Sequence, residues 1–152
     1  MFLAELLERT GLDVLDHLDR QVTVPVIDGL QAQGDLLVLP LTLLAAPAWR
    51  GGWWDLPPEG CELVRGEAGN NPHTLVADRG TCRMTWWPND PERLAIAAFD
   101  TTAPAWLIHP EHGATGVAPG AWFVRRQREL RTRLVQRRQM RTGVQETVLI
   151  AD

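Results

Sequence analysis

The pattern of apolar and polar positions changes near residue 22. Before that point, apolar residues recur at helical spacing over residues 2–10 and again over 12–20, and Gly11 stands between the two runs as a stop signal. We therefore expect short N-terminal helices within residues 1–21.

Beyond residue 22 the pattern is typical of strands. Valines alternate with other residues over 22–26, the run 36–44 is long and apolar as in a strand buried on both faces, and shorter candidates follow about every ten residues. These candidates span residues 61–65, 74–77, 81–87, 94–98, 105–108, 121–130 and 147–150. The pattern predicts a mainly β fold: a small closed or nearly closed barrel, or a two-sheet roll with short N-terminal helices.

Residues 45–60 interrupt this pattern with prolines, glycines and three tryptophans, Trp49, Trp53 and Trp54. Such rings can form a ligand platform. Large aromatic side chains more often fold over a sheet as a lid on its core, and we favour that interpretation.

Composition limits the class of protein. The 152 residues predict a single domain, divided into the segment 1–21, a β core over 22–130, and a basic segment with a closing strand over 131–152. No apolar run approaches the roughly 20 residues of a membrane span, and no basic leader precedes the first apolar residues. Cys61 and Cys82 form no CxxC pair. We expect reduced core cysteines in a soluble, cytoplasmic protein.

Histidines supply one candidate site. His109 and His112 flank Pro110 and Glu111, whereas His73 follows a turn-rich segment that also contains Glu67. Because a transition metal needs several ligands brought together, the metal-site hypothesis uses His73, His109, His112 and Glu67. The alternative is that these histidines cap turns or bind backbone groups. His17, among acidic residues, is expected on the surface.

Other reaction classes lack support. The sequence contains no serine, which excludes a serine–histidine–acid triad, and neither GxxxxGK[ST] nor GxGxxG occurs. A cysteine nucleophile paired with His73 has no activating signal for its thiol.

Arginine supplies the second candidate site. All 15 basic residues are arginines, and eight of them lie between residues 125 and 141, where Glu129 is the only acid. The eight candidates for partner binding are Arg125, Arg126, Arg128, Arg131, Arg133, Arg137, Arg138 and Arg141. We favour an extended ribbon or a strand that enters an exposed loop, with a helix over 126–140 as the alternative. The arginines could bind phosphates, an acidic protein surface or another copy of this chain, or form a solvated edge that blocks aggregation.

Four stretches resemble a group of small bacterial β proteins of uncharacterised activity. They are GDLLVLPL, LVRGEAGNNPHTLVAD, WLIHPEHGATGVAPGAWFVRRQRE and the final VLIAD. The shared pattern is GExxGxxH, then HxEHG, then PGxYxVxRQRE. It falls on Glu67, Gly69, His73, His109, Glu111, His112, Gly113, Pro119, Gly120, Arg126, Gln127, Arg128 and Glu129, with the glycine of the first turn, Gly69, one position earlier than in the pattern. The chain departs from it in having one histidine in the first turn, tryptophan at position 122 where tyrosine is usual, and an apparent insertion over 130–144. The resemblance implies a fold and a site location, not a reaction. In ligand type alone, the histidine set also resembles cupin metal sites, but the cupin HxH pair is missing.

Our first hypothesis is therefore a non-enzymatic accessory protein that docks a macromolecular partner, most simply a protein, through its arginine-rich segment. The second is a metal-binding enzyme or sensor that uses the histidines. The third is an RNA- or DNA-binding module that uses Arg125 to Arg141.

Overall fold

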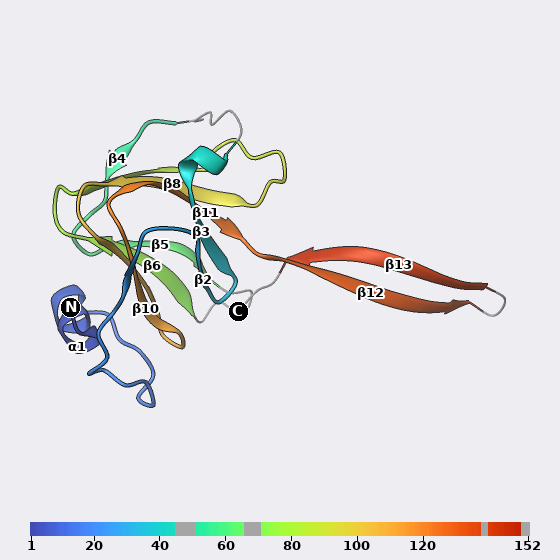
Figure 1. The fold of residues 1–152 in the computed structure, drawn as a ribbon, viewed down its shortest axis with the longest axis horizontal. Coiled ribbons are helices and arrows are strands. Elements are labelled where there is room, and N and C mark those ends of the chain that lie inside the picture. Colours follow the sequence, from blue (N-terminus) through green and yellow to red (C-terminus); the bar gives the residue numbers. More distant parts are fainter. Residues whose placement is uncertain (45–50, 66–70, 138–139, 150–152) are drawn as a thin grey trace.

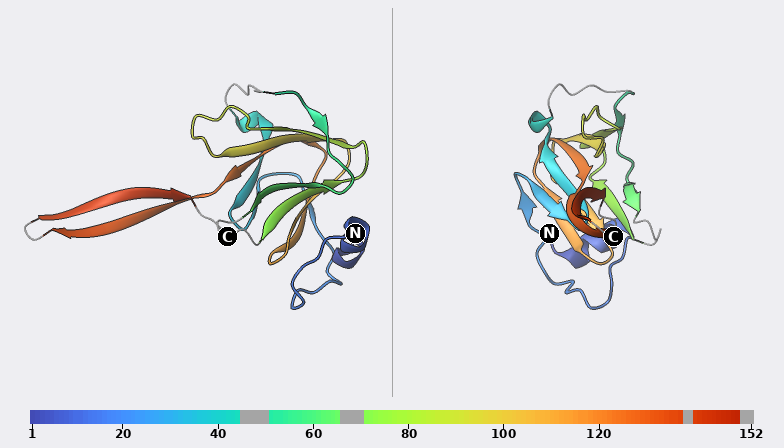
Figure 2. Two further views of the ribbon diagram at one scale, coloured as in Figure 1. Left: turned by 180° about the vertical axis from the view of Figure 1, so that it is seen from behind. Right: turned by 90° about the vertical axis from the view of Figure 1, so that its right-hand side faces the viewer.

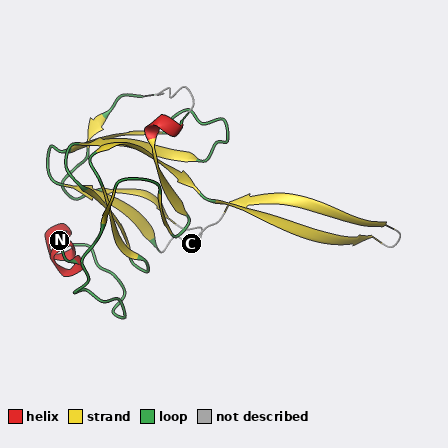
Figure 3. Cartoon of the chain, viewed as in Figure 1, coloured by secondary structure: helices red, strands yellow, loops and turns green. Residues whose placement is uncertain are grey.

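The structure, a computed structural model, describes residues 1–44, 51–65, 71–137 and 140–149. Two β-sheets face each other as a roll that is not closed into a barrel, a short helix lies at one end, and a two-stranded ribbon extends from the other (Figure 1). The predicted mainly β fold is thus confirmed, in its roll form. Figure 3 shows how strands dominate the described chain.

The first sheet has five strands. Their order is β1 (Val26–Ile27), β10 (Gly113–Val117), β9 (Ala105–His109), β6 (Pro72–Ala77) and β5 (Cys61–Arg65). All pairs are antiparallel except β1 with β10. Every residue of β9 is buried, because its sheet is covered on both faces.

The second sheet has six strands. Their order is β2 (Gln31–Gln33), β3 (Leu36–Pro40), β11 (Gly120–Arg126), β8 (Ala95–Thr101), β7 (Cys82–Trp86) and β4 (Trp54–Asp55). A one-turn 3-10 helix, η1 (Leu41–Leu43), follows β3. Residues 36–44 therefore form one strand and a helical turn, and Pro40 ends the strand.

The main core lies between the two sheets, and alternation along β9 shows how it is built. Leu107 points into the core with Phe99 and Met84, whereas its neighbours Trp106 and Ile108 belong to a second cluster on the outer face. This is the two-residue period of a strand with apolar neighbours on both sides.

Helix α1 (Leu3–Thr10) covers that outer face. Its leucines Leu3, Leu6 and Leu7 are buried against the sheet, and such burial contributes about 1.5–3 kcal/mol per side chain. Gly11, with φ of +68°, ends the helix in the left-handed conformation that glycine adopts without strain.

The prediction of a helix over 12–20 is wrong. Those residues form turns, in which the Asp13 and Asp19 side chains accept hydrogen bonds from the backbone N–H groups of Val14 and Gln21. Short aspartate side chains compete in this way with the helical hydrogen-bond ladder. The helical part of the segment 1–21 is therefore α1, and the following turns are fixed to the sheet by the Leu15 N–H bond to Pro110 O, 2.8 Å long.

The tryptophan loop forms part of the lid that we favoured. Trp54 packs against the core, and its ring centroid lies 6.3 Å from that of Trp86. The guanidinium carbon Cζ of Arg83 lies over the Trp53 ring, 5.4 Å from the ring centroid. Trp49 lies outside the described residues.

The basic segment forms the ribbon. Strands β12 (Arg128–Arg137) and β13 (Met140–Leu149) pair antiparallel along their full length, from Arg128 opposite Leu149 to Arg137 opposite Met140. Figures 1 and 2 show the ribbon extending away from the two sheets. The predicted ribbon is confirmed and the helical alternative is wrong. The predicted closing strand 147–150 also differs: residues 147–149 end β13 and pair with β12, and Ile150 lies outside the described residues.

Candidate functional site

Three histidines converge at one end of the roll, and we call His73, His109 and His112 the histidine cluster. His73 lies on β6 and His109 ends β9, and the pairing of these strands brings the two rings to 4.3 Å between centroids. His112 lies in the bend before β10, and its ring stacks on His109 at 4.4 Å. His73 and His109 are fully buried, whereas His112 is exposed. The structure thus brings together the three histidines that the sequence singled out.

Hydrogen bonds fix the state of His73. Its Nδ1 lies 3.1 Å from Gln33 Oε1, and the amide nitrogen of Gln33 donates to the carbonyl oxygens of Leu107 at 2.9 Å and Gly113 at 3.4 Å. Because carbonyl oxygens only accept, the Gln33 amide can have one orientation, and its oxygen faces His73. Nδ1 of His73 must therefore carry a proton and donate it to Gln33.

The other nitrogen of His73 faces a carboxylate. Nε2 lies 3.0 Å from Oδ1 of Asp35, and both side chains are almost fully buried. One proton lies between these atoms, either on the ring as an imidazolium–carboxylate pair or on a neutral carboxyl group. In both cases the two ring nitrogens of His73 are engaged within the protein. A metal ion could bind His73 only by displacing one of these partners.

His109 organises the bend that follows it. Its Nδ1 accepts the backbone N–H groups of Glu111 at 3.1 Å and His112 at 3.3 Å, so this nitrogen carries no proton. The HPEH segment therefore wraps around its own first histidine, as in the turn-capping alternative. His17, as expected, is exposed.

One part of the histidine cluster can be assembled into a metal-binding group. His109, Glu111 and His112 each offer a ligand atom, and these atoms lie within 4.8 Å of one another. The rings of His109 and His112 are stacked with their planes 25° apart, and an imidazole binds a metal ion through a lone pair that lies in its own ring plane. The exposed His112 would therefore have to turn to share an ion with His109. Glu67, the fourth predicted ligand, lies outside the described residues.

Sequence analysis missed Gln33 and Asp35, which hold His73 in place. Gln33 lies in β2, a strand that the hydrophobic pattern did not predict, and Asp35 precedes β3 directly. The available signal was a charged residue at the entrance to a wholly apolar strand, because such a residue needs a buried partner. Two other strands were not predicted: β4, within the tryptophan loop, and β10, whose sequence, GATGV, is poor in large apolar residues.

The cysteines are not activated thiolates. Burial raises the pKa of Cys82 to about 12. A hydrogen bond with Thr101 acts in the opposite direction, and the negative charge of Asp100 adds to the increase. Burial also raises the pKa of Cys61, with a smaller contribution from Glu62. Both thiols are free and stay protonated at neutral pH.

The arginines divide into two groups. In the described part of residues 1–127, which we call the body, four arginines bind carboxylates: Arg9 with Asp78, Arg20 with Asp13, Arg83 with Asp100, and Arg125 with Glu92. Arg125 and Arg126 lie on β11 and so belong to the body. Of the other predicted partner-binding residues, Arg128, Arg131, Arg133, Arg137 and Arg141 lie on the ribbon, and Arg138 lies outside the described residues.

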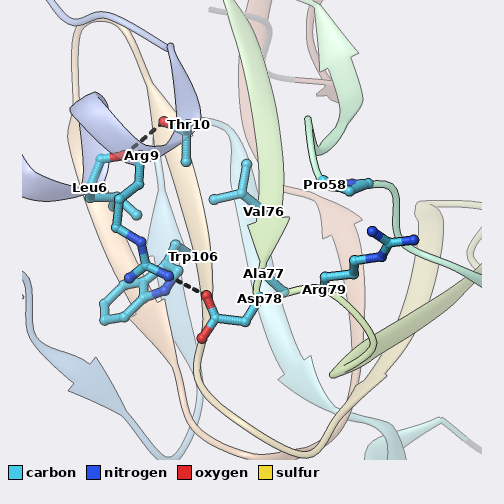
Figure 4. Close-up of a pocket in the computed structure, with 9 residues that line it drawn as sticks. All are labelled: Leu6, Arg9, Thr10, Pro58, Val76, Ala77, Asp78, Arg79 and Trp106. Atoms are coloured by element: carbon cyan, nitrogen blue, oxygen red, sulfur yellow. Dashed lines mark hydrogen bonds and ion pairs between the residues drawn. The ribbon is translucent and has the colours of Figure 1, made fainter.

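A small pocket opens between α1 and the five-stranded sheet (Figure 4). It has a volume of about 150 Å³ and is lined by Leu6, Arg9, Thr10, Pro58, Val76, Ala77, Asp78, Arg79 and Trp106. Two of the lining residues, Arg9 and Asp78, form an ion pair. Its volume is below the roughly 300 Å³ at which drug-sized ligand sites begin.

No helix in the described part of the chain has the length and apolar character needed to cross a membrane.

Comparison with known proteins gives one match. No curated protein and no solved structure matches the chain. Residues 32–127 match the family model described as Domain of unknown function (DUF8820), which is 96 of the 152 residues. The match begins in β2 and ends one residue before β12, so it includes Gln33, Asp35 and the histidine cluster but neither α1 nor the ribbon. The chain therefore belongs to the DUF8820 family.

Proposed function

We propose that the protein binds a macromolecular partner through the ribbon, β12–β13. The observation that carries this proposal is the ribbon itself. Within the described residues, its two strands pair with each other and with no strand of the body, and they extend away from the two sheets (Figure 2).

Stability alone gives little reason for such a ribbon. A two-stranded hairpin without a third strand or a packed face is marginally stable in water. Its outer edges also present unpaired backbone groups, which invite pairing with other chains. A long ribbon of this kind is best explained by contacts with another molecule.

Charge supports the same assignment. Residues 128–149 hold six arginines and two acids, a formal charge of +4, whereas residues 1–127 hold nine arginines and sixteen acids, a formal charge of −7. A partner with an anionic surface would be attracted to the ribbon and repelled by the body.

The proposal assigns binding rather than catalysis. His73 and His109 are buried and hydrogen-bonded, and the cysteine thiols are protonated, so the described ionisable groups favour structure over chemistry. The free thiols are typical of a reducing compartment, and we place the protein in the cytoplasm.

Site-specific photo-crosslinking in cells tests the proposal. A photoreactive residue at Thr142, in β13, should give a discrete adduct, whereas one at Thr102, an exposed position of the body, should not. The adduct is then treated with nuclease and with protease to identify its class. Equal labelling at both positions, or no adduct at Thr142, would contradict the proposal.

A second candidate function is metal binding at His109, Glu111 and His112, which is supported by the proximity of their ligand atoms. Elemental analysis of the purified protein should then show a transition metal that is lost on His112→Ala and retained on His17→Ala. A metal-free wild-type protein that also takes up no added zinc would exclude it.

A further inference from the structure

The net positive charge of the ribbon comes from its outer half, because the charges of the inner half cancel. In the inner five ladder pairs, residues 128–132 and 145–149, two arginines are balanced by Glu129 and Glu146. The outer five pairs, residues 133–137 and 140–144, contain three arginines and no acid. The positive charge thus lies as far from the body as the ribbon allows.

Distance separates this charge from the acidic body. Five strand residues span about 17 Å, at about 3.3 Å per residue. That is about twice the Debye length of roughly 8 Å at physiological salt, so the field of the body is largely screened at the outer half. A highly charged anion can therefore approach the outer half with little repulsion from the body.

The shape and composition of the ribbon narrow the class of anion. A two-stranded β-ribbon fits the major groove of B-form DNA, whereas the major groove of A-form RNA is too deep and narrow for side chains to reach the bases. The ribbon contains no aromatic residue. It therefore lacks both the stacking platforms of single-strand binders and the aromatic anchors common in protein interfaces. Arginine, glutamine and threonine, which it does contain, are residues that contact phosphates and base edges.

We infer that the partner of the ribbon is double-stranded DNA, which is bound through Arg133, Arg137 and Arg141 of the outer half. This inference rests on the proposed function and names its partner class. Binding of this kind is dominated by phosphate neutralisation and depends steeply on salt concentration.

The experiment measures binding of the purified full chain to labelled nucleic acid by fluorescence anisotropy at about 50–200 mM salt. The probes are a mixed-sequence DNA duplex of about two helical turns, the RNA duplex of the same sequence, and one DNA strand. We expect the DNA duplex to bind tightest, with a slope of log K against log salt of about −3, since each phosphate contact contributes about −0.9.

Two matched variants locate the site. The double variant Arg137→Gln/Arg141→Gln should flatten the slope to about −1 and weaken binding at low salt by at least about tenfold, because each phosphate contact contributes about one unit of slope. The control Arg79→Gln/Arg93→Gln removes the same charge from two exposed positions of the body and should bind as the wild type does. Unchanged thermal unfolding of both variants shows that the fold is intact.

The outcomes separate this inference from the proposed function. Loss of binding in both double variants alike, or tighter binding to the RNA duplex or the single strand, would overturn the assignment to DNA. A ribbon crosslink in cells that is protease-sensitive and nuclease-resistant, with no duplex binding by the purified protein, would also overturn it while leaving the docking proposal in place. Absence of any ribbon crosslink would defeat both.

Discussion

The histidine cluster and the ribbon both gather ionisable residues, but they place them in opposite surroundings. His73 is buried, and both of its nitrogens have partners within the same sheet roll. The outer half of the ribbon carries three arginines in a segment without acids, far from the acidic body. A buried, hydrogen-bonded group of histidines therefore indicates a structural role, whereas a basic segment that lies outside the two sheets is the better candidate for contact with another molecule.

The structural role of the histidine cluster can be tested at His73. Replacement by alanine removes the ring that shares a proton with Asp35 and so breaks this buried pair. Breaking a buried pair in this way costs about 3–5 kcal/mol of unfolding free energy. We expect His73→Ala to lower the urea midpoint accordingly, with His17→Ala unchanged. A loss below about 1 kcal/mol would mean that the cluster is not structural.

Asp90 offers a smaller, pH-dependent test within the body. Burial alone would raise the pKa of its carboxyl group, but the N–H groups of Leu94, Glu92 and Ala95 and the charge of Arg125 outweigh it and lower that pKa below 3.8. The ionised carboxylate therefore stabilises the fold above pH 3.8, and its contribution is lost as pH falls through the lowered value.

We expect Asp90→Asn to cost about 1 kcal/mol at neutral pH, because hydrogen bonds to a charged acceptor weaken. The difference from the wild type should shrink as pH is lowered below 3.8. Asp28→Asn, at an exposed loop position, serves as the control in the same urea series. A difference that stays constant with pH would show that the charge of Asp90 does not contribute.

Removal of the ribbon should have the smallest effect on stability. Replacing residues 129–148 by two glycines removes strands that pair only with each other within the described chain, and it shortens the connection. The free energy of unfolding of the body, measured by urea titration, should change by less than about 0.5 kcal/mol. DNA binding should disappear. A loss above about 2 kcal/mol would show that the ribbon supports the body, which would weaken the contrast.

Much of the fold could be predicted from local patterns. Strand β5 was predicted with the observed bounds, and β6 to β9 within a few residues, because alternating apolar residues between turn formers select extended structure whatever the neighbours are. Gly11 marked the end of α1 for a local reason too, its positive φ. The helix over 12–20 failed because three aspartates favour turns, a competition that periodicity does not weigh.

A strand-rich fold and a basic segment with few acids follow from the sequence alone, as does the closeness of His109 and His112 along the chain. Only the folded chain brings distant residues into contact. The pairing of β6 with β9 placed His73 beside His109, and the end of β2 and the turn that follows it supplied Gln33 and Asp35 as its partners. The pairing of β12 with β13 left the arginine segment outside the two sheets. Hydrogen bonds and ion pairs act over a few ångströms, and only the folded chain decides which distant residues come that close.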